Sequence, residues 1–229
     1  MEVAMPVSLL CLVLLSSFML GRIIFGAASD FVVASLDLGL GFISFAGVLL
    51  TRKKLPKFVF PLYIQGCLLG ATWEFGFDLL GDDFCSILIQ QLRTPGLRAV
   101  SHSFTDGLLF ILGVGLVLEW CPKPHFSKWS GVEILMFLLW GNVQEIVVDI
   151  AGNGWIWQYH QTPYNPVMFT LDGESYTFIP QFVWIISPCV FYFLTLVQFS
   201  QSSPSEGKVL LQPEEERRTL ESPLLQKYN

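Results

Sequence analysis

Charged residues are scarce in this sequence. Its 229 residues include 19 Asp and Glu and 13 Lys and Arg, or 14% of the chain, against about 25% in soluble domains. Residues 201–229 hold nine of these charges, so the remainder has too few to cover the surface of a water-soluble globule. The net charge of −6 also argues against nucleic acid as a partner. The composition therefore excludes a soluble enzyme, a nucleic-acid-binding protein and a wholly disordered chain.

Known catalytic and metal-binding motifs are also missing. The sequence has no HExxH, no GxSxG and no P-loop. Its five cysteines show no CxxC or other metal-ligand spacing. Four of them lie in or beside apolar runs, where cysteine is a small packing residue, and only Cys85 falls in an expected loop. We therefore expect neither a metal nor another cofactor.

Apolar residues, in contrast, make up 52% of the chain. They concentrate in six runs, at residues 6–26, 31–50, 58–80, 104–121, 130–151 and 178–199. Each run is close to the ~20 residues that a helix needs to cross a bilayer. The sequence thus predicts an all-α fold, a polytopic membrane bundle of about six transmembrane helices over residues 1–199. Alternatively, residues 1–28 are a cleaved signal peptide, although no Lys or Arg precedes their apolar stretch.

Lys and Arg are distributed unevenly between the loops. Arg22, Arg93 and Arg98 belong to one side of the expected bundle. Ten belong to the other side: Arg52, Lys53, Lys54, Lys57, Lys123, Lys128, Lys208, Arg217, Arg218 and Lys227. The positive-inside rule then places both termini in the cytoplasm, and residues 81–103 and 152–177 on the luminal or external side.

Residues 200–229 are rich in Ser, Glu and Pro and have no apolar period, which predicts a disordered cytoplasmic tail. Within it, Glu206, Leu210 and Leu211 form a pattern that resembles the acidic dileucine signal read by clathrin adaptors. Such a signal would place the protein in endosomes or lysosomes. Another endomembrane or the plasma membrane remains open, with the tail a plain solvated extension.

Two of the expected spans end in similar sequences. Residues 70–84 read GATWEFGFDLLGDDF, and residues 141–155 read GNVQEIVVDIAGNGW. The two segments share Gly, Glu, Asp and Gly at a constant offset of 71 residues. We interpret this as a parallel duplication of two helices, in which spans three and four correspond to spans five and six.

The repeat carries four acidic residues, Glu74, Asp78, Glu145 and Asp149. Within each pair the spacing is four residues, so both carboxylates lie on one face of their helix. In the non-cytoplasmic half of the bilayer, a carboxylate facing lipid costs about 2–3 kcal/mol even on the lenient insertion scale. We therefore expect all four to face the bundle interior, or the outer two to be solvated at the interface.

Two further acids are candidates for a binding site. Asp37 lies in the middle of span two, and Asp106 lies at the start of span four, where it could instead cap the helix. The bases expected on this side are too few to pair with every acid: Arg22, Arg93, Arg98, His102 and His160. Some acids should therefore be protonated or should bind a positively charged ion or substrate.

The loop at residues 154–166 is rich in aromatic residues, including Trp155, Trp157 and Tyr159. It could lie over the bundle as a lid, or it could form an aromatic belt at the membrane interface.

The last span contains Gln181-Phe-Val-Trp184-Ile-Ile-Ser-Pro188. This stretch resembles the N-x2-W-x3-P pattern of the emopamil-binding (EXPERA) family, whose four-helix membrane domains isomerise or bind sterols. The resemblance implies that spans three to six form such a domain, with Glu74, Gln181 and Trp184 around a sterol-like cation. The sequence departs from the family in having Gln181 for Asn, in lacking the family's His before Glu74, and in lacking the family's Glu on the second helix.

Three classes of function remain open. The first is a transporter of a cation, or of a solute coupled to protons, that uses the repeated acids. The second is a protein that binds or isomerises a sterol or another lipid, with a Glu as proton donor and Trp184 facing the cation. The third is a non-catalytic scaffold or trafficking factor with structural acids. An oligomer is compatible with all three.

Overall fold

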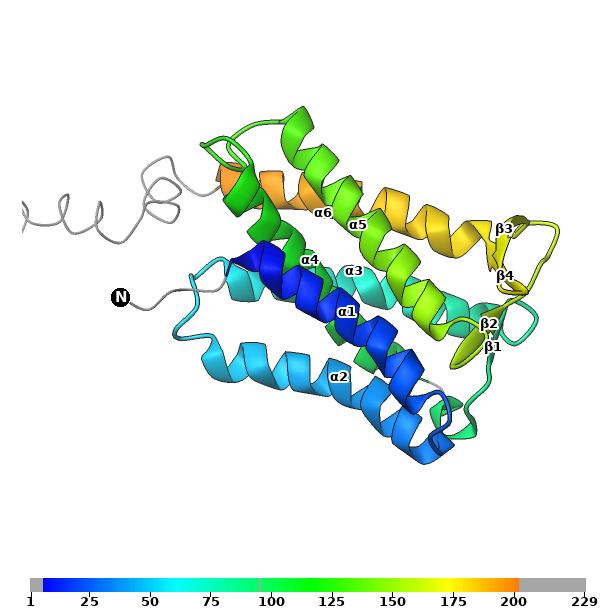
Figure 1. Cartoon of the computed structure of the whole chain (residues 1–229). Helices are drawn as coiled ribbons and strands as arrows, with labels where there is room; N and C mark the ends of the chain where they lie inside the picture. The colour runs from blue at the N-terminus through cyan, green and yellow to red at the C-terminus, as the bar shows by residue number, and fades with distance from the viewer. Residues whose placement is uncertain (1–5, 95, 202–229) are drawn as a thin grey trace, which may run out of the picture.

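The structure is a computed structural model that describes residues 6–94 and 96–201. The chain forms, in order, α1 (Val7–Phe25), α2 (Asp30–Thr51), α3 (Val59–Leu80), β1 (Cys85–Ile87), the 3-10 helix η1 (Gln90–Leu92), α4 (Leu97–Trp120), α5 (Gly131–Gly152), β2 (Trp157–Tyr159), β3 (Val167–Leu171), β4 (Glu174–Thr177) and α6 (Phe178–Gln201) (Figure 1). The predominantly helical fold was predicted, and the four short strands were not. The expected sorting signal at Glu206, Leu210 and Leu211 lies outside the described residues.

Five of the six long helices, α1, α2, α4, α5 and α6, are long and apolar enough to cross a membrane. Helix α3 is of similar length but is not among them. Large apolar side chains are exposed on the outer faces of the bundle, above all on α1, α2 and α6. A bundle with this much exposed apolar surface is suited to lipid rather than to water.

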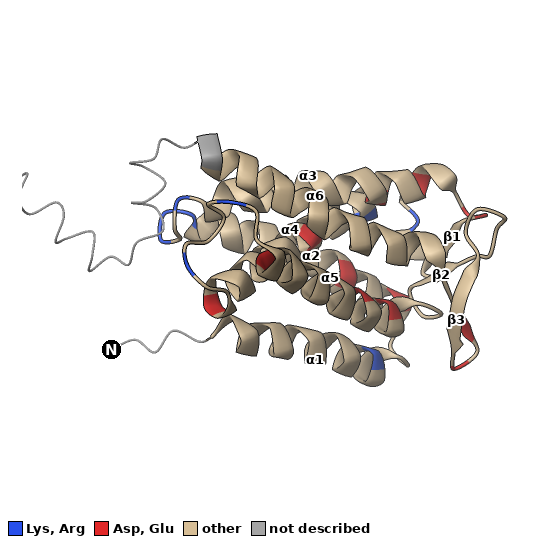
Figure 2. Ribbon diagram, turned by 90° about the horizontal axis from the view of Figure 1, so that it is seen from above, with Lys and Arg blue, Asp and Glu red and all other residues tan. Residues whose placement is uncertain are grey.

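Successive long helices run in opposite directions, so the bundle has two distinct ends (Figure 1). One end, here called the basic end, contains the loops after α2 and α4 with Arg52, Lys53, Lys54, Lys57, Lys123 and Lys128 (Figure 2). The other, here called the strand end, contains the turn between α1 and α2 and all four strands. Helical segments between these ends carry several Asp and Glu residues (Figure 2).

Helices α3 and α4 form the most extensive helix pair. A Cβ atom at Gly70 would overlap the side chain of Asp106, so glycine allows the two backbones to approach here. Gly141, the counterpart of Gly70 in the repeat, has a similar place on α5, where a Cβ atom would overlap Pro188 of α6. Each helix of the repeated sequence therefore packs closely against the helix that follows it.

The strand end is closed by two antiparallel strand pairs. Strand β1 follows α3, β2 follows α5, and the two pair with Cys85 opposite Tyr159 and Ile87 opposite Trp157. Strands β3 and β4 form a separate hairpin just before α6. The pairing of β1 with β2 connects the ends of α3 and α5, which bear the repeated acids.

Five of the six predicted spans agree with the helices to within two residues, but α4 begins seven residues before predicted span four. Arg98 and His102 therefore lie within a helix rather than in a loop. Asp106 lies in the third turn of α4, not at its start, so the helix-capping interpretation is wrong. The hydropathy scan missed this segment because its polar side chains face other polar groups inside the bundle instead of lipid.

Candidate functional site: a buried acidic cavity

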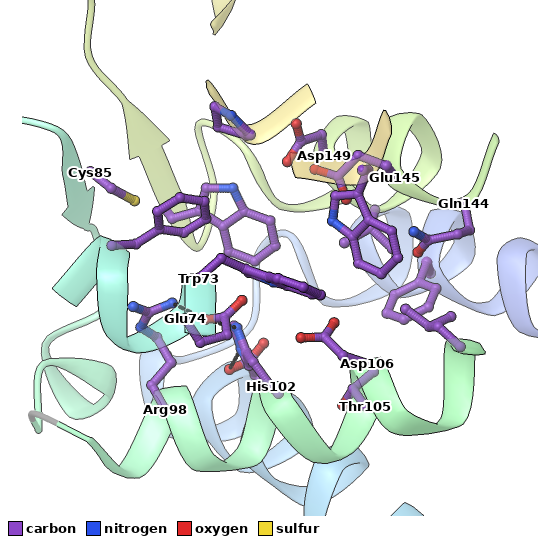
Figure 3. A pocket seen from close by; sticks show the side chains of 18 of the residues that line it. Trp73, Glu74, Cys85, Arg98, His102, Thr105, Asp106, Gln144, Glu145 and Asp149 are labelled. Atoms are coloured by element: carbon purple, nitrogen blue, oxygen red, sulfur yellow. Dashed lines mark hydrogen bonds and ion pairs between the residues drawn. The ribbon is translucent and has the colours of Figure 1, made fainter. Parts of the chain in front are cut away.

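A cavity of about 90 Å³ lies inside the strand-end half of the bundle. Five carboxylates from four helices line it: Asp37 of α2, Glu74 of α3, Asp106 of α4, and Glu145 and Asp149 of α5 (Figure 3). The sixth predicted acid, Asp78, does not line the cavity. It forms an ion pair with Arg98, and Arg98 does line the cavity. The fold thus brings together all six acids that the sequence singled out.

One part of the cavity is charge-compensated, and we call it the paired half: Asp37, Glu74, Asp78, Arg98 and His102. Arg98 donates to Glu74 Oε2 over 3.2 Å and also forms an ion pair with Asp78. His102 Nε2 lies 3.0 Å from Asp37 Oδ2, and its Nδ1 lies 3.4 Å from Glu74 Oε2. Acids and bases therefore alternate along one chain of contacts. Arg98 and His102, two of the five bases expected on this side, thus compensate only part of the acids.

The other part, the unpaired half, consists of Asp106, Glu145 and Asp149 with two amides, Gln144 and Gln181. The residues are deeply buried, with exposed fractions of 6% for Asp106 and Glu145 and 2% for Asp149. Gln181 Nε2 donates to Asp149 Oδ2 over 2.5 Å. Asp106 Oδ2 and Gln144 Oε1 are buried without any hydrogen-bond partner in the described protein. Within the same residues, no Lys, Arg or His forms an ion pair with these three acids.

The remaining bases of the strand end are engaged elsewhere. Arg22 donates to backbone carbonyls at the end of α5, including that of Asn153 at 3.0 Å. Arg93 Nε donates to the carbonyl of Ile87 over 2.8 Å, and His160 Nε2 lies 2.5 Å from Ser86 Oγ. Three buried carboxylates without a cation cannot all stay ionised at tolerable cost, so they hold protons or receive a cation from outside the chain.

Aromatic side chains close the cavity at both ends. Toward the basic end, the rings of Trp73 and Trp184 meet edge to face with centroids 5.5 Å apart, and Phe110 stacks on Trp184 at 5.6 Å. Toward the strand end, Trp157 and Tyr159 line the wall. The part of the aromatic loop (residues 154–166) that forms β2 therefore covers the cavity as a lid. The electron-rich faces of such rings can stabilise a cation.

Two groups of the lid region keep their protons. Burial, followed by the negative charge of Asp149, raises the pKa of Tyr159 well above its usual value, so its hydroxyl remains a donor. Burial also raises the pKa of Cys85 to about 12, so this residue is a thiol near neutral pH and not a nucleophile. These groups supply polarity to the wall without adding charge.

An apolar crevice of about 250 Å³ adjoins the cavity. It is lined by side chains of α1, α2 and α5 and shares residues with the cavity, among them Phe18, Asp37 and Trp157. Helix α1 packs on α4 and α5, α2 packs on α4, and α1 and α2 make little contact with each other. The acidic cavity thus adjoins an apolar space between two peripheral helices.

Sequence reasoning missed Arg98, His102 and Gln144 as members of the site. A usable signal was present, because Arg98, His102 and Asp106 are spaced by four residues and so share one helix face. Gly96 ahead of them has a positive φ of 77° and is the N-cap of α4, and a turn glycine at this place marks an earlier helix start. Nothing in the sequence identified Gln144 as an unpartnered amide.

The chain matches no family model, no curated protein and no solved structure.

Proposed function

We propose that the protein is a multi-pass membrane protein that binds an amphiphilic molecule with a cationic group, and that this group lies among Asp106, Glu145 and Asp149. The observation that carries the proposal is the buried, unpaired state of these three acids beside an apolar crevice. A structural role accounts for the paired half, where Arg98 and His102 compensate the acids. It does not account for the unpaired half, since apolar residues would fill the same space at lower cost.

The shape of the site supports a ligand with an apolar body. The crevice between α1 and α2 is lined mainly by apolar side chains, such as Leu14, Phe25 and Leu36. Asp37 lies where the crevice meets the acidic cavity. A molecule entering sideways from the bilayer would leave its apolar part in the crevice and carry its polar group to the acids. Binding sites of this kind are mostly apolar with a few convergent polar groups.

The resemblance to the emopamil-binding family supports the same class of ligand. Glu74 and Trp184 line one cavity, and Gln181 bonds to Asp149 beside it. The Glu of the second helix of that unit, α4, is Glu119, which accepts a hydrogen bond from Ser8 away from the cavity, and α4 contributes a carboxylate to the cavity through Asp106. If the protein isomerised a bound sterol-like molecule, one of these acids would also have to transfer a proton to it. Binding of the molecule would precede that step.

We also propose that all six long helices cross the membrane, with both termini in the cytoplasm. Helix α3 would be the sixth span, because it lies along α4 and its acids face the interior. The basic loops at one end support this orientation. A duplication is supported by the common order of helix, glycine and strand in α3–β1 and α5–β2, and by the pairing of the two strands.

Mass spectrometry of the protein purified in a mild detergent tests the binding proposal. We expect a co-purifying organic cation with an apolar body, and at least a tenfold loss of it in the Asp106→Asn, Glu145→Gln double variant. Asp83→Asn is the matched control, because Asp83 is an exposed carboxylate at the same end. A wild-type protein that carries and binds no such molecule, or a double variant that retains it fully, would contradict the proposal.

Proton-coupled transport is a second candidate, and the chain of contacts through the paired half favours it. Asp78, Arg98, Glu74, His102 and Asp37 link the strand end to the crevice. An imidazole with a carboxylate at each nitrogen can pass a proton between them.

A pH-sensitive dye inside proteoliposomes tests this candidate. We expect a proton flux that falls at least tenfold in His102→Gln, because this variant interrupts the chain of contacts. The flux should be retained in His160→Gln, because His160 lies outside the chain. If the wild type carries no proton flux, transport is excluded and the binding proposal stands alone.

A further inference from the structure

The two copies of the repeated acid pair differ in what they hold. In the first copy, Glu74 and Asp78 together bind the guanidinium of Arg98, which comes from the following helix. In the second copy, Glu145 and Asp149 have the same spacing on α5, and the following helix α6 presents only the amide of Gln181. The same pair of acids therefore binds a cation in one copy and lacks one in the other.

The unpaired half has more acceptors than donors, although the buried indole N–H of Trp157 in the cavity wall is also without a partner among the described residues. Asp106 Oδ2 and Gln144 Oε1 are both buried, line the cavity and have no partner among the residues that the structure describes. The Gln144 amide nitrogen is already used, because it donates to the carbonyl of Gly141 over 3.0 Å. All three acids line the cavity, and Figure 3 shows Asp106 on one side of it and Glu145 and Asp149 on the other. A ligand group that satisfies these buried acceptors and acids must donate several hydrogen bonds as well as carry positive charge.

We propose that the ligand carries a guanidinium, amidinium or primary ammonium group that bridges Glu145 and Asp149 as Arg98 bridges Glu74 and Asp78. This inference rests on the proposed function and narrows its ligand to cations with several N–H donors. A quaternary ammonium would neutralise charge but leave the buried acceptors unsatisfied. A bare metal ion is disfavoured, because no group of three or more His, Cys, Asp or Glu side chains in the described part of the chain could hold one.

The planar guanidinium matches this site best. Its N–H groups form a fixed fork that reaches two acceptors at once, as they do at Glu74 and Asp78. The remaining N–H groups would satisfy Asp106 Oδ2 and Gln144 Oε1, while Trp73 and Trp184 offer ring faces to the same cation. An alkyl chain on the guanidinium would extend past Asp37 into the apolar crevice.

Calorimetry on the full chain in lipid nanodiscs tests this inference with two probes that share one alkyl chain. Dodecylguanidinium has several N–H donors, and dodecyltrimethylammonium has none. We expect the first to bind at least tenfold more tightly. The preference should disappear in the Glu145→Gln, Asp149→Asn double variant and persist in Asp83→Asn. Neutralising uncompensated buried acids does not endanger folding, and circular dichroism checks that the variant retains its helices.

The outcomes separate this inference from the proposed function. Equal affinity of the two probes would overturn the N–H-donor inference while leaving cation binding intact. Binding of neither probe, with no co-purified cation, would overturn both. A preference for dodecylguanidinium that survives in the double variant would also overturn the inference, because the acids of the second copy would then not be the recognition element. A Gln144→Leu variant gives a milder test, in which loss of one acceptor should reduce the preference between the probes.

Discussion

The Arg98→Met protein should be less stable than the wild type by about 3–5 kcal/mol, because the substitution removes one partner from a buried ionic network. Arg98 is buried and contacts both Glu74 and Asp78. Methionine fills part of the same volume but leaves two carboxylates without their cation. The measurement is the free energy of unfolding in detergent, followed by circular dichroism during titration with a denaturing detergent.

Two companion proteins make this prediction specific. Arg93→Met removes an exposed arginine that bonds to a single carbonyl, and its effect should stay below about 1 kcal/mol. Adding Glu74→Gln and Asp78→Asn to Arg98→Met removes the uncompensated charges and should recover most of the lost stability. If Arg98→Met and Arg93→Met were equally stable, the paired half would not hold the bundle together as described.

The helices could be predicted closely from the sequence because the bilayer imposes a simple requirement on them. A span needs about 20 apolar residues, and five apolar runs agree with helices to within two residues. The exception, α4, shows the limit of the method. Its first two turns carry Arg98 and His102, and a scan for apolar residues cannot distinguish a polar loop from a helix whose polar face is buried.

The acids of the site were predictable, but their partners were not. A carboxylate inside an apolar run is costly wherever it faces lipid, so the positions of Glu74 and Glu145 alone indicate an interior site. Which acids are neutralised depends on how α2, α3 and α4 pack. For example, Asp37 of α2 meets His102 only because α2 packs against α4. Likewise, three-residue strands such as β1 and β2 carry too short a pattern to be recognised before their pairing is seen.

Replacing Gln181 with lysine should abolish binding of dodecylguanidinium, with at least a hundredfold loss of affinity, or about 2.7 kcal/mol. Gln181 comes from α6 and bonds directly to Asp149. A lysine at this place would supply an ammonium from the following helix, as Arg98 does in the first copy of the repeat. The acids would then be compensated within the chain, and a ligand cation would meet both a filled site and a like charge. Calorimetry in nanodiscs measures the affinity.

The matched control for this substitution is Gln181→Leu, which removes the bond to Asp149 without adding charge. It should retain binding to within about tenfold, since a single neutral hydrogen bond contributes about 1 kcal/mol. The contrast between the two variants isolates the charge from the shape of the side chain. Equal losses in both would mean that Gln181 acts by packing. Unchanged binding in Gln181→Lys would mean that the ligand does not lie at Asp149, because two cations cannot occupy one buried acid pair without a large electrostatic cost.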